Sequence, residues 1–70
     1  MKVLIVVEKA RTGYSAYSPD LPGCAATGPT RQRTVARMRA AIRFHVEGLR
    51  ATGQRIPRPT SSSTYVVVPA

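Results

Sequence analysis

The stretch GPTRQRTVARMRAAIRFHVEGL, residues 28–49, decides the fold, because the spacing of the apolar residues changes within it. Its apolar side chains recur at intervals of three and four residues, which places them on one face of a helix. They are Val35, Met38, Ile42, Val46 and Leu49. Thr30 is a good N-cap residue and Gly53 a good helix stop, so we expect a helix over about residues 31–52.

Three segments before this helix are typical of strands. The β-branched run KVLIVVEK (2–9) carries apolar residues at both odd and even positions, as a central strand does. YSAYSPDL (14–21) follows after a turn at 10–13, in which Gly13 can take a positive φ. GCAATG (23–28) is a short third strand.

Two segments follow the helix. Residues 54–63, QRIPRPTSSS, form a proline- and serine-rich connection, and residues 64–70, TYVVVPA, are expected to form a last strand. The order is β-β-β-α-β. The sequence therefore predicts one α+β domain over residues 1–70, with a single helix packed on one face of a four-stranded sheet.

The charge of the chain concerns its partners. Eleven Lys and Arg residues against three Asp and Glu give a net charge of +8. Nucleic acid, an acidic protein partner and a plain compositional bias all stay open as explanations of this net charge.

The apolar run at residues 3–7 is too short for a signal peptide or a membrane span. With a single cysteine, the chain is expected to be intracellular, with no membrane partner.

The residues needed for catalysis are scarce. His45 is the single histidine, and the three carboxylates are scattered, whereas metal-dependent phosphodiester chemistry needs several convergent ones. No glycine-rich phosphate loop is present. We therefore expect no enzymatic activity, no cofactor and no metal site.

The face of the helix opposite its apolar stripe is a candidate contact surface. Ala36, Ala40 and Phe44 lie opposite the core and form a candidate partner interface, although a lone exposed aromatic is also common. Because one helix covers only one face of an apolar sheet, we also expect a homo-oligomer, a dimer or a tetramer.

Arginines occupy the first turns of the helix, where acidic residues are usually favoured. Arg31, Arg33 and Arg37 are candidate contacts for an anion or for nucleic acid, since a helix N-terminus itself attracts phosphate. They could equally face solvent, or contact an acidic protein. All three interpretations stay open.

A rigid corner follows the second strand. Its residues form a candidate structural turn motif: Pro19, Asp20, Leu21, Pro22, Gly23 and Cys24. We expect the Asp20 carboxylate to cap free backbone N–H groups of this corner.

The corner and its spacing to later motifs resemble a known family. YSPDLPGC (17–24), then G-x-T (28–30) opening a helix, and I-P-x-P (56–59) are similar to the HicB antitoxins, formerly an uncharacterised protein family. The resemblance covers residues 2–69. It departs in the first helical turn, where the family usually carries G-D-T followed by glutamates and this chain has GPTRQR.

The resemblance implies a partial RNase H-like fold, with the last strand beside the first. It also implies a cytoplasmic antitoxin of a type II toxin–antitoxin system that binds a small HicA-type mRNA-cleaving toxin, with catalysis belonging to the toxin. Many members carry a C-terminal DNA-binding domain, and we expect none in this chain. The alternative hypothesis is a small basic RNA- or DNA-binding protein on the same scaffold.

Overall fold

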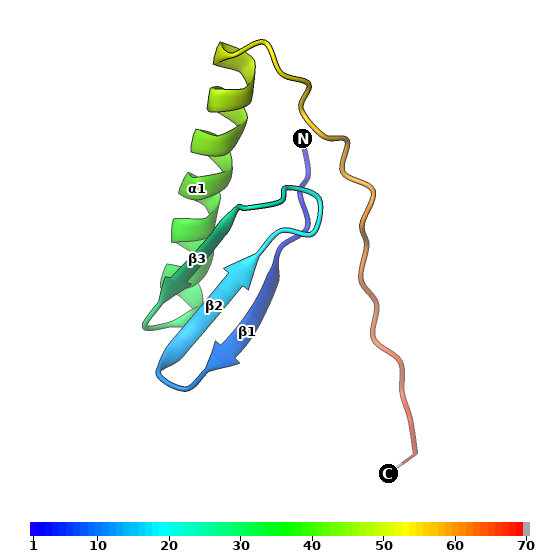
Figure 1. Cartoon of the computed structure of the whole chain (residues 1–70). Helices are drawn as coiled ribbons and strands as arrows, with labels where there is room; N and C mark the ends of the chain where they lie inside the picture. Colours follow the sequence, from blue (N-terminus) through cyan, green and yellow to red (C-terminus); the bar gives the residue numbers. More distant parts are fainter. Residues whose placement is uncertain (70) are drawn as a thin grey trace.

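A three-stranded antiparallel sheet is covered on one face by a long helix, and an extended segment follows (Figure 1). The computed structural model describes residues 1–69. The strands lie in the order β1-β2-β3. Their bounds are β1 Val6–Ala10, β2 Gly13–Tyr17 and β3 Ala25–Gly28, and the helix α1 is Arg31–Ala51.

The β1–β2 hairpin is closed by two residues, Arg11 and Thr12, because Ala10 is paired with Gly13. Gly13 has a φ of 104°, as the sequence predicts. In this register Val7 lies opposite Ala16 and faces α1, while Val6 lies opposite Tyr17 on the outer face. Strand alternation thus directs one set of apolar residues into the core and leaves another uncovered.

All three strands are shorter than the sequence predicts. Pro19 has no N–H to donate to a ladder, and the neighbouring Ser18 N–H donates to the Cys24 carbonyl oxygen instead (3.3 Å). β2 therefore ends at Tyr17, and the segment before β1 loses its partner strand. The Ser18 hydroxyl donates to the Leu4 carbonyl oxygen (3.1 Å), which ties that segment down without a ladder.

The core is small. Its buried apolar residues are Ala16, Leu21, Cys24 and Met38. Partly buried side chains from β1, β3 and α1 pack around them. Burial raises the pKa of the Cys24 thiol, so this cysteine is apolar filler rather than a reactive group.

Both helix ends lie where the sequence places them. The Thr30 hydroxyl accepts a hydrogen bond from the Arg33 N–H (3.1 Å). At the other end, the Gly53 N–H donates to the Arg50 carbonyl oxygen (3.1 Å) and the Gln54 N–H to that of Leu49 (2.8 Å). With Gly53 at a φ of 71°, these bonds form a Schellman motif that ends α1.

The predicted fourth strand at 64–70 is wrong over the residues that the structure describes. Residues 54–69 contain no helix or strand and run past the sheet as an extended segment (Figure 1). β-Branched residues favour a strand only where a neighbouring strand offers hydrogen bonds and packing. The sheet therefore has three strands instead of four.

The start of α1 is packed directly on the end of β3. Thr34 is fully buried, and its hydroxyl donates to the Thr30 carbonyl oxygen (2.7 Å). A Cβ at Gly28 would lie 2.7 Å from Thr34 Oγ1 and 3.0 Å from the Thr34 backbone nitrogen. On the other side, a Cβ at Gly13 would collide with the Gly28 carbonyl oxygen. Glycine at 28 is thus required by close backbone approach.

We predict that Gly28→Ala lowers the free energy of unfolding by about 1–3 kcal/mol, the usual cost of overpacking a rigid site. The matched control is Gly48→Ala, because a Cβ there meets no atom within 4 Å. The control should stabilise α1 by about 0.5–1 kcal/mol, since glycine is unfavourable inside a helix. Urea denaturation measures both, and equal stabilities of the two variants would contradict the packing argument.

Candidate functional site

The stripe Ala36, Ala40 and Phe44 runs along the exposed side of α1. The three residues follow one another at intervals of four, so they share one helix face. All three are exposed, and Phe44 is 80% exposed, whereas the opposite side of α1 packs on the core. An aromatic ring beside two small residues is a surface suited to protein contact.

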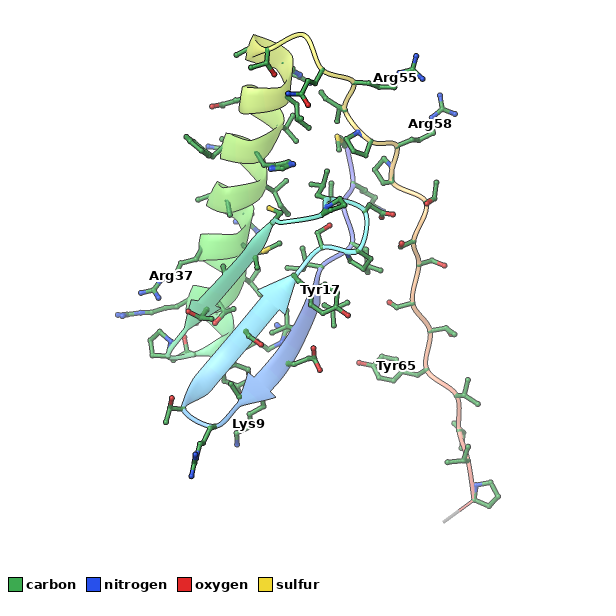
Figure 2. All side chains as sticks on the ribbon, in the orientation of Figure 1. Lys9, Tyr17, Arg37, Arg55, Arg58 and Tyr65 are labelled. Carbon is green, nitrogen blue, oxygen red and sulfur yellow. The ribbon has the colours of Figure 1, made fainter. Side chains whose placement is uncertain are left out.

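The predicted arginine contacts divide into two kinds. Arg31 and Arg33 are exposed in the first turn of α1, which has no acidic residue. Arg37 is also exposed, but its guanidinium donates to the Thr27 carbonyl oxygen (3.0 Å) and ties α1 to β3 (Figure 2). Arg37 therefore has a structural contact in addition to its charge.

Two further exposed arginines are not among the contact residues predicted from the sequence. Arg55 and Arg58 lie in the extended segment, where both side chains are exposed and project away from the domain (Figure 2). Their alternation with Pro57 and Pro59 is the signal that could have found them, because proline keeps such a segment extended.

Backbone hydrogen bonds close the corner at residues 18–24. The Leu21 N–H donates to the Ser18 carbonyl oxygen (3.3 Å), and the Cys24 N–H to that of Leu21 (3.1 Å). Leu21 is fully buried and Cys24 nearly so, whereas Pro19, Pro22 and Gly23 are exposed. The corner thus directs two apolar side chains inward and turns the chain from β2 into β3.

Asp20 does not cap this corner, so that prediction is wrong. Its carboxylate accepts hydrogen bonds from Ser61, through the backbone N–H (3.2 Å) and the hydroxyl (2.9 Å), and from the Thr60 hydroxyl (3.4 Å). The corner is already closed by its own backbone, which leaves the carboxylate free for a distant segment. Asp20 therefore attaches the extended segment to the domain.

These hydrogen bonds set the ionisation of Asp20. Partial desolvation raises the pKa of the carboxyl group, but the hydrogen bonds from Ser61 and Thr60 outweigh it and hold the pKa below its ordinary value of 3.8. The charged form is the one that holds the segment.

The outer face of the sheet has no covering layer within the described residues. Tyr17 is 46% exposed there, and its strand partner Val6 is half-buried.

Residues 1–69 contain no group of three or more His, Cys, Asp or Glu side chains suited to a metal ion. Within the same range, no helix has the length and apolar character needed to cross a membrane.

The sequence matches a family model described as the HicB-like antitoxin of a bacterial toxin–antitoxin system, over residues 3–70. The chain belongs to the HicB-like antitoxin family. This membership agrees with the resemblance carried by YSPDLPGC (17–24) and I-P-x-P (56–59).

Two proteins are similar to this HicB-like chain over most of its length. An uncharacterised 14.9 kDa protein of Haemophilus phage HP1 is 32% identical over 65 residues, which are 93% of this chain and 49% of the relative. A UPF0150 protein of Thermoplasma acidophilum is 31% identical over 67 residues, 94% of this chain and 97% of the relative. The chain thus spans about half of the phage protein and nearly all of the archaeal one.

We predict that acid releases the extended segment before it unfolds the domain. Because the folded pKa of Asp20 is lowered, the attachment is present above pH 3.8 and is lost as the pH falls through the folded pKa. Asp20→Asn should likewise reduce the protection of the Ser61 amide against hydrogen exchange, because a neutral amide oxygen is a weaker acceptor than a carboxylate, with little change in the melting temperature. NMR measures both, and Glu8→Gln is the control because it removes an exposed carboxylate elsewhere. A large fall in the melting temperature of Asp20→Asn would contradict this prediction, because it would mean that the attachment of the segment also stabilises the domain.

Proposed function

We propose that this HicB-like chain is the antitoxin of a type II toxin–antitoxin pair and neutralises a small HicA-type mRNA-cleaving toxin in the cytoplasm. The observation that carries the proposal is the family match over residues 3–70, since the antitoxin family implies a toxin partner in general. The chain acts by binding rather than by catalysis. Its fold is proposed to be the partial RNase H-like framework that the family resemblance implies.

The exposed side of α1 is the proposed contact surface for the toxin. Phe44 is the anchor, because a large exposed aromatic ring between small residues fits a pocket on a partner. The arginines around it, together with the net charge of +8, favour a toxin with an acidic contact surface. The open outer face of the sheet, with Tyr17 and Val6, supports self-association as a second interaction.

We predict that Phe44→Asp weakens toxin binding by about 30-fold or more, the effect of losing an interface hot spot. The melting temperature should change little, because the ring contacts no core residue. The measurement is calorimetric titration with an inactive toxin variant, together with rescue of growth on co-expression with the active toxin. Arg11→Ala is the control, since Arg11 is exposed but lies in the β1–β2 turn rather than on α1. Unchanged affinity for Phe44→Asp would remove this surface from the toxin interface.

RNA or duplex DNA binding is the second candidate function. The observation in its favour is the arginine-rich first turn of α1, which adds Arg31 and Arg33 to an N-terminus that already attracts anions. This function needs no toxin, so the two candidates are separable.

If the chain binds RNA or DNA, the logarithm of the binding constant should fall linearly with the logarithm of the salt concentration, because each neutralised phosphate releases counterions. The double variant Arg31→Glu with Arg33→Glu should then flatten the slope by about one to two units, one for each lost phosphate contact. The same change should stabilise α1 by about 0.3–1 kcal/mol per residue, because glutamate matches the helix dipole. The contrary result would be a wild type that binds no nucleic acid at physiological salt, together with a double variant that is more stable. Arg31 and Arg33 would then be solvent-exposed residues without a binding role.

A further inference from the structure

Residues 64–68 have the apolar, β-branched sequence of a strand but pair with no strand of the sheet. Residues 64–68, TYVVV, are exposed, with Tyr65 at 102% and Val67 at 97% of full exposure. In Figure 2 the Tyr65 ring points from the extended segment to the side on which the sheet lies, but its full exposure shows that it does not pack on the sheet. In an extended chain, Tyr65 and Val67 share one side while Val66 and Val68 share the other. This donor segment therefore carries apolar side chains on both faces.

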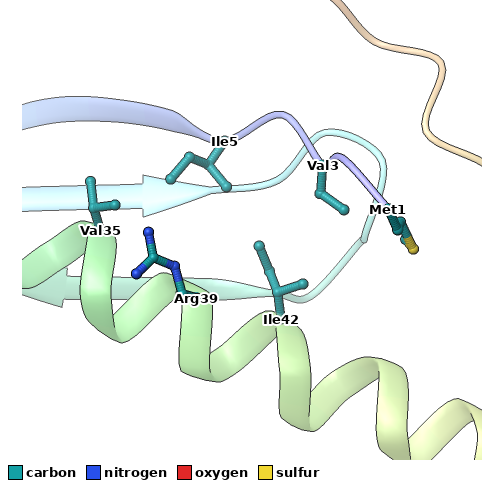
Figure 3. A pocket seen from close by; sticks show the side chains of 6 residues that line it. All are labelled: Met1, Val3, Ile5, Val35, Arg39 and Ile42. Atoms are coloured by element: carbon teal, nitrogen blue, oxygen red, sulfur yellow. The ribbon is translucent and has the colours of Figure 1, made fainter.

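The acceptor is the free edge of the sheet along β1 and the residues before it. β1 is an edge strand, because β2 is its neighbour on one side and no described strand lies on the other. Between this segment and α1 lies an open groove of about 280 Å³. It is lined by Met1, Val3, Ile5, Val35, Arg39 and Ile42 (Figure 3). The helix lies mainly over β3 and β2, and this offset leaves the groove open.

The connection brings the donor close to this edge without placing it there. Residues 59 and 61–63 lie opposite residues 2–4 across a second hollow of about 520 Å³. Asp20 holds residues 60–61 at this position, and the chain then runs on past the sheet (Figure 1). Pro57 and Pro59 keep the connection extended up to this attachment, and residues 64–68 continue beyond it without pairing with the edge.

The surface left open is large enough for an interface. The chain exposes 5869 Å², whereas a compact monomer of 7.6 kDa exposes about 4,300 Å². The excess of roughly 1,600 Å² exceeds the ~800 Å² that each partner contributes to a standard protein–protein interface. The radius of gyration agrees, at 13.9 Å against about 11 Å for a compact chain of this length.

We propose that two copies of this chain exchange residues 64–68, each segment adding as a strand to the free edge of β1 in the other copy. One alternate pair of side chains enters the groove beside Val3 and Ile5, and the other extends the outer face beside Val6. The donor and the acceptor belong to the same sequence, so a two-fold arrangement satisfies both edges at once and closes the assembly. The inference rests on the self-association proposed above and does not depend on the identity of the toxin.

The first test is the oligomeric state of the purified chain by sedimentation at micromolar concentration. The wild type should be a dimer. Val67→Asp should raise the dimer dissociation constant by about 100-fold or more, because each dimer loses two buried valines and would bury two carboxylates. Ser62→Asp is the matched control, since it adds the same charge to the connection outside the donor. A monomeric wild type, or an unchanged Val67→Asp dimer, overturns the proposal.

The second test uses the wild type alone and separates exchange from folding back. Labelled and unlabelled copies are mixed, and NMR detects contacts that pass between the two kinds of chain. Contacts between Val67 and Ile5 across copies support the exchange, whereas contacts confined to one copy overturn it.

Toxin binding is measured on the same samples, so that the two proposals fail separately. A Val67→Asp monomer that still binds toxin supports the exchange and leaves the proposed function intact. A dimer that binds no toxin contradicts the proposed function alone. Protection of residues 64–68 that requires added toxin would assign the donor strand to the toxin and overturn the exchange.

Discussion

The close approach of β3 to the first turn of α1 is the constraint on which the rest of the structure depends. Gly28 and Thr34 meet with no room for a Cβ, and Gly13 packs against Gly28 from the hairpin. This contact fixes where α1 begins and which face it turns to the sheet. Because the helix is anchored at the end of β3, it covers β3 and β2 and leaves the β1 side open.

A domain arranged in this way buries few apolar side chains and leaves many of them exposed to solvent. Its fully buried side chains are Leu21, Met38 and Thr34, while apolar groups stay accessible on the outer sheet face, at Phe44 and in residues 65–68. Such a surface is costly to keep in water and favours association. Membership of the HicB-like antitoxin family is in keeping with the binding function proposed above.

Asp20 gives the corner a role that goes beyond turning the chain. The backbone bonds among residues 18–24 already form the turn, so the carboxylate is available to hold Thr60 and Ser61, forty residues away in the sequence. This contact attaches the extended segment next to the N-terminus while leaving its β-branched end free. Because the contact depends on a charged carboxylate, solution conditions affect the segment more than the domain.

The sequence by itself determined the elements whose signals are local. The helix from Arg31, its Thr30 cap, its end at Gly53, the hairpin turn at Gly13 and the family could all be predicted from residue spacing and short motifs. The strand ends, the partner of Asp20 and the state of residues 64–69 were decided by tertiary structure alone. The physical reason is that a strand exists only where another strand pairs with it, and a carboxylate bonds whichever donors the fold brings within reach. Propensity marks TYVVV as a strand, but only the arrangement of α1, β1 and the Asp20 attachment leaves it without a partner in its own chain.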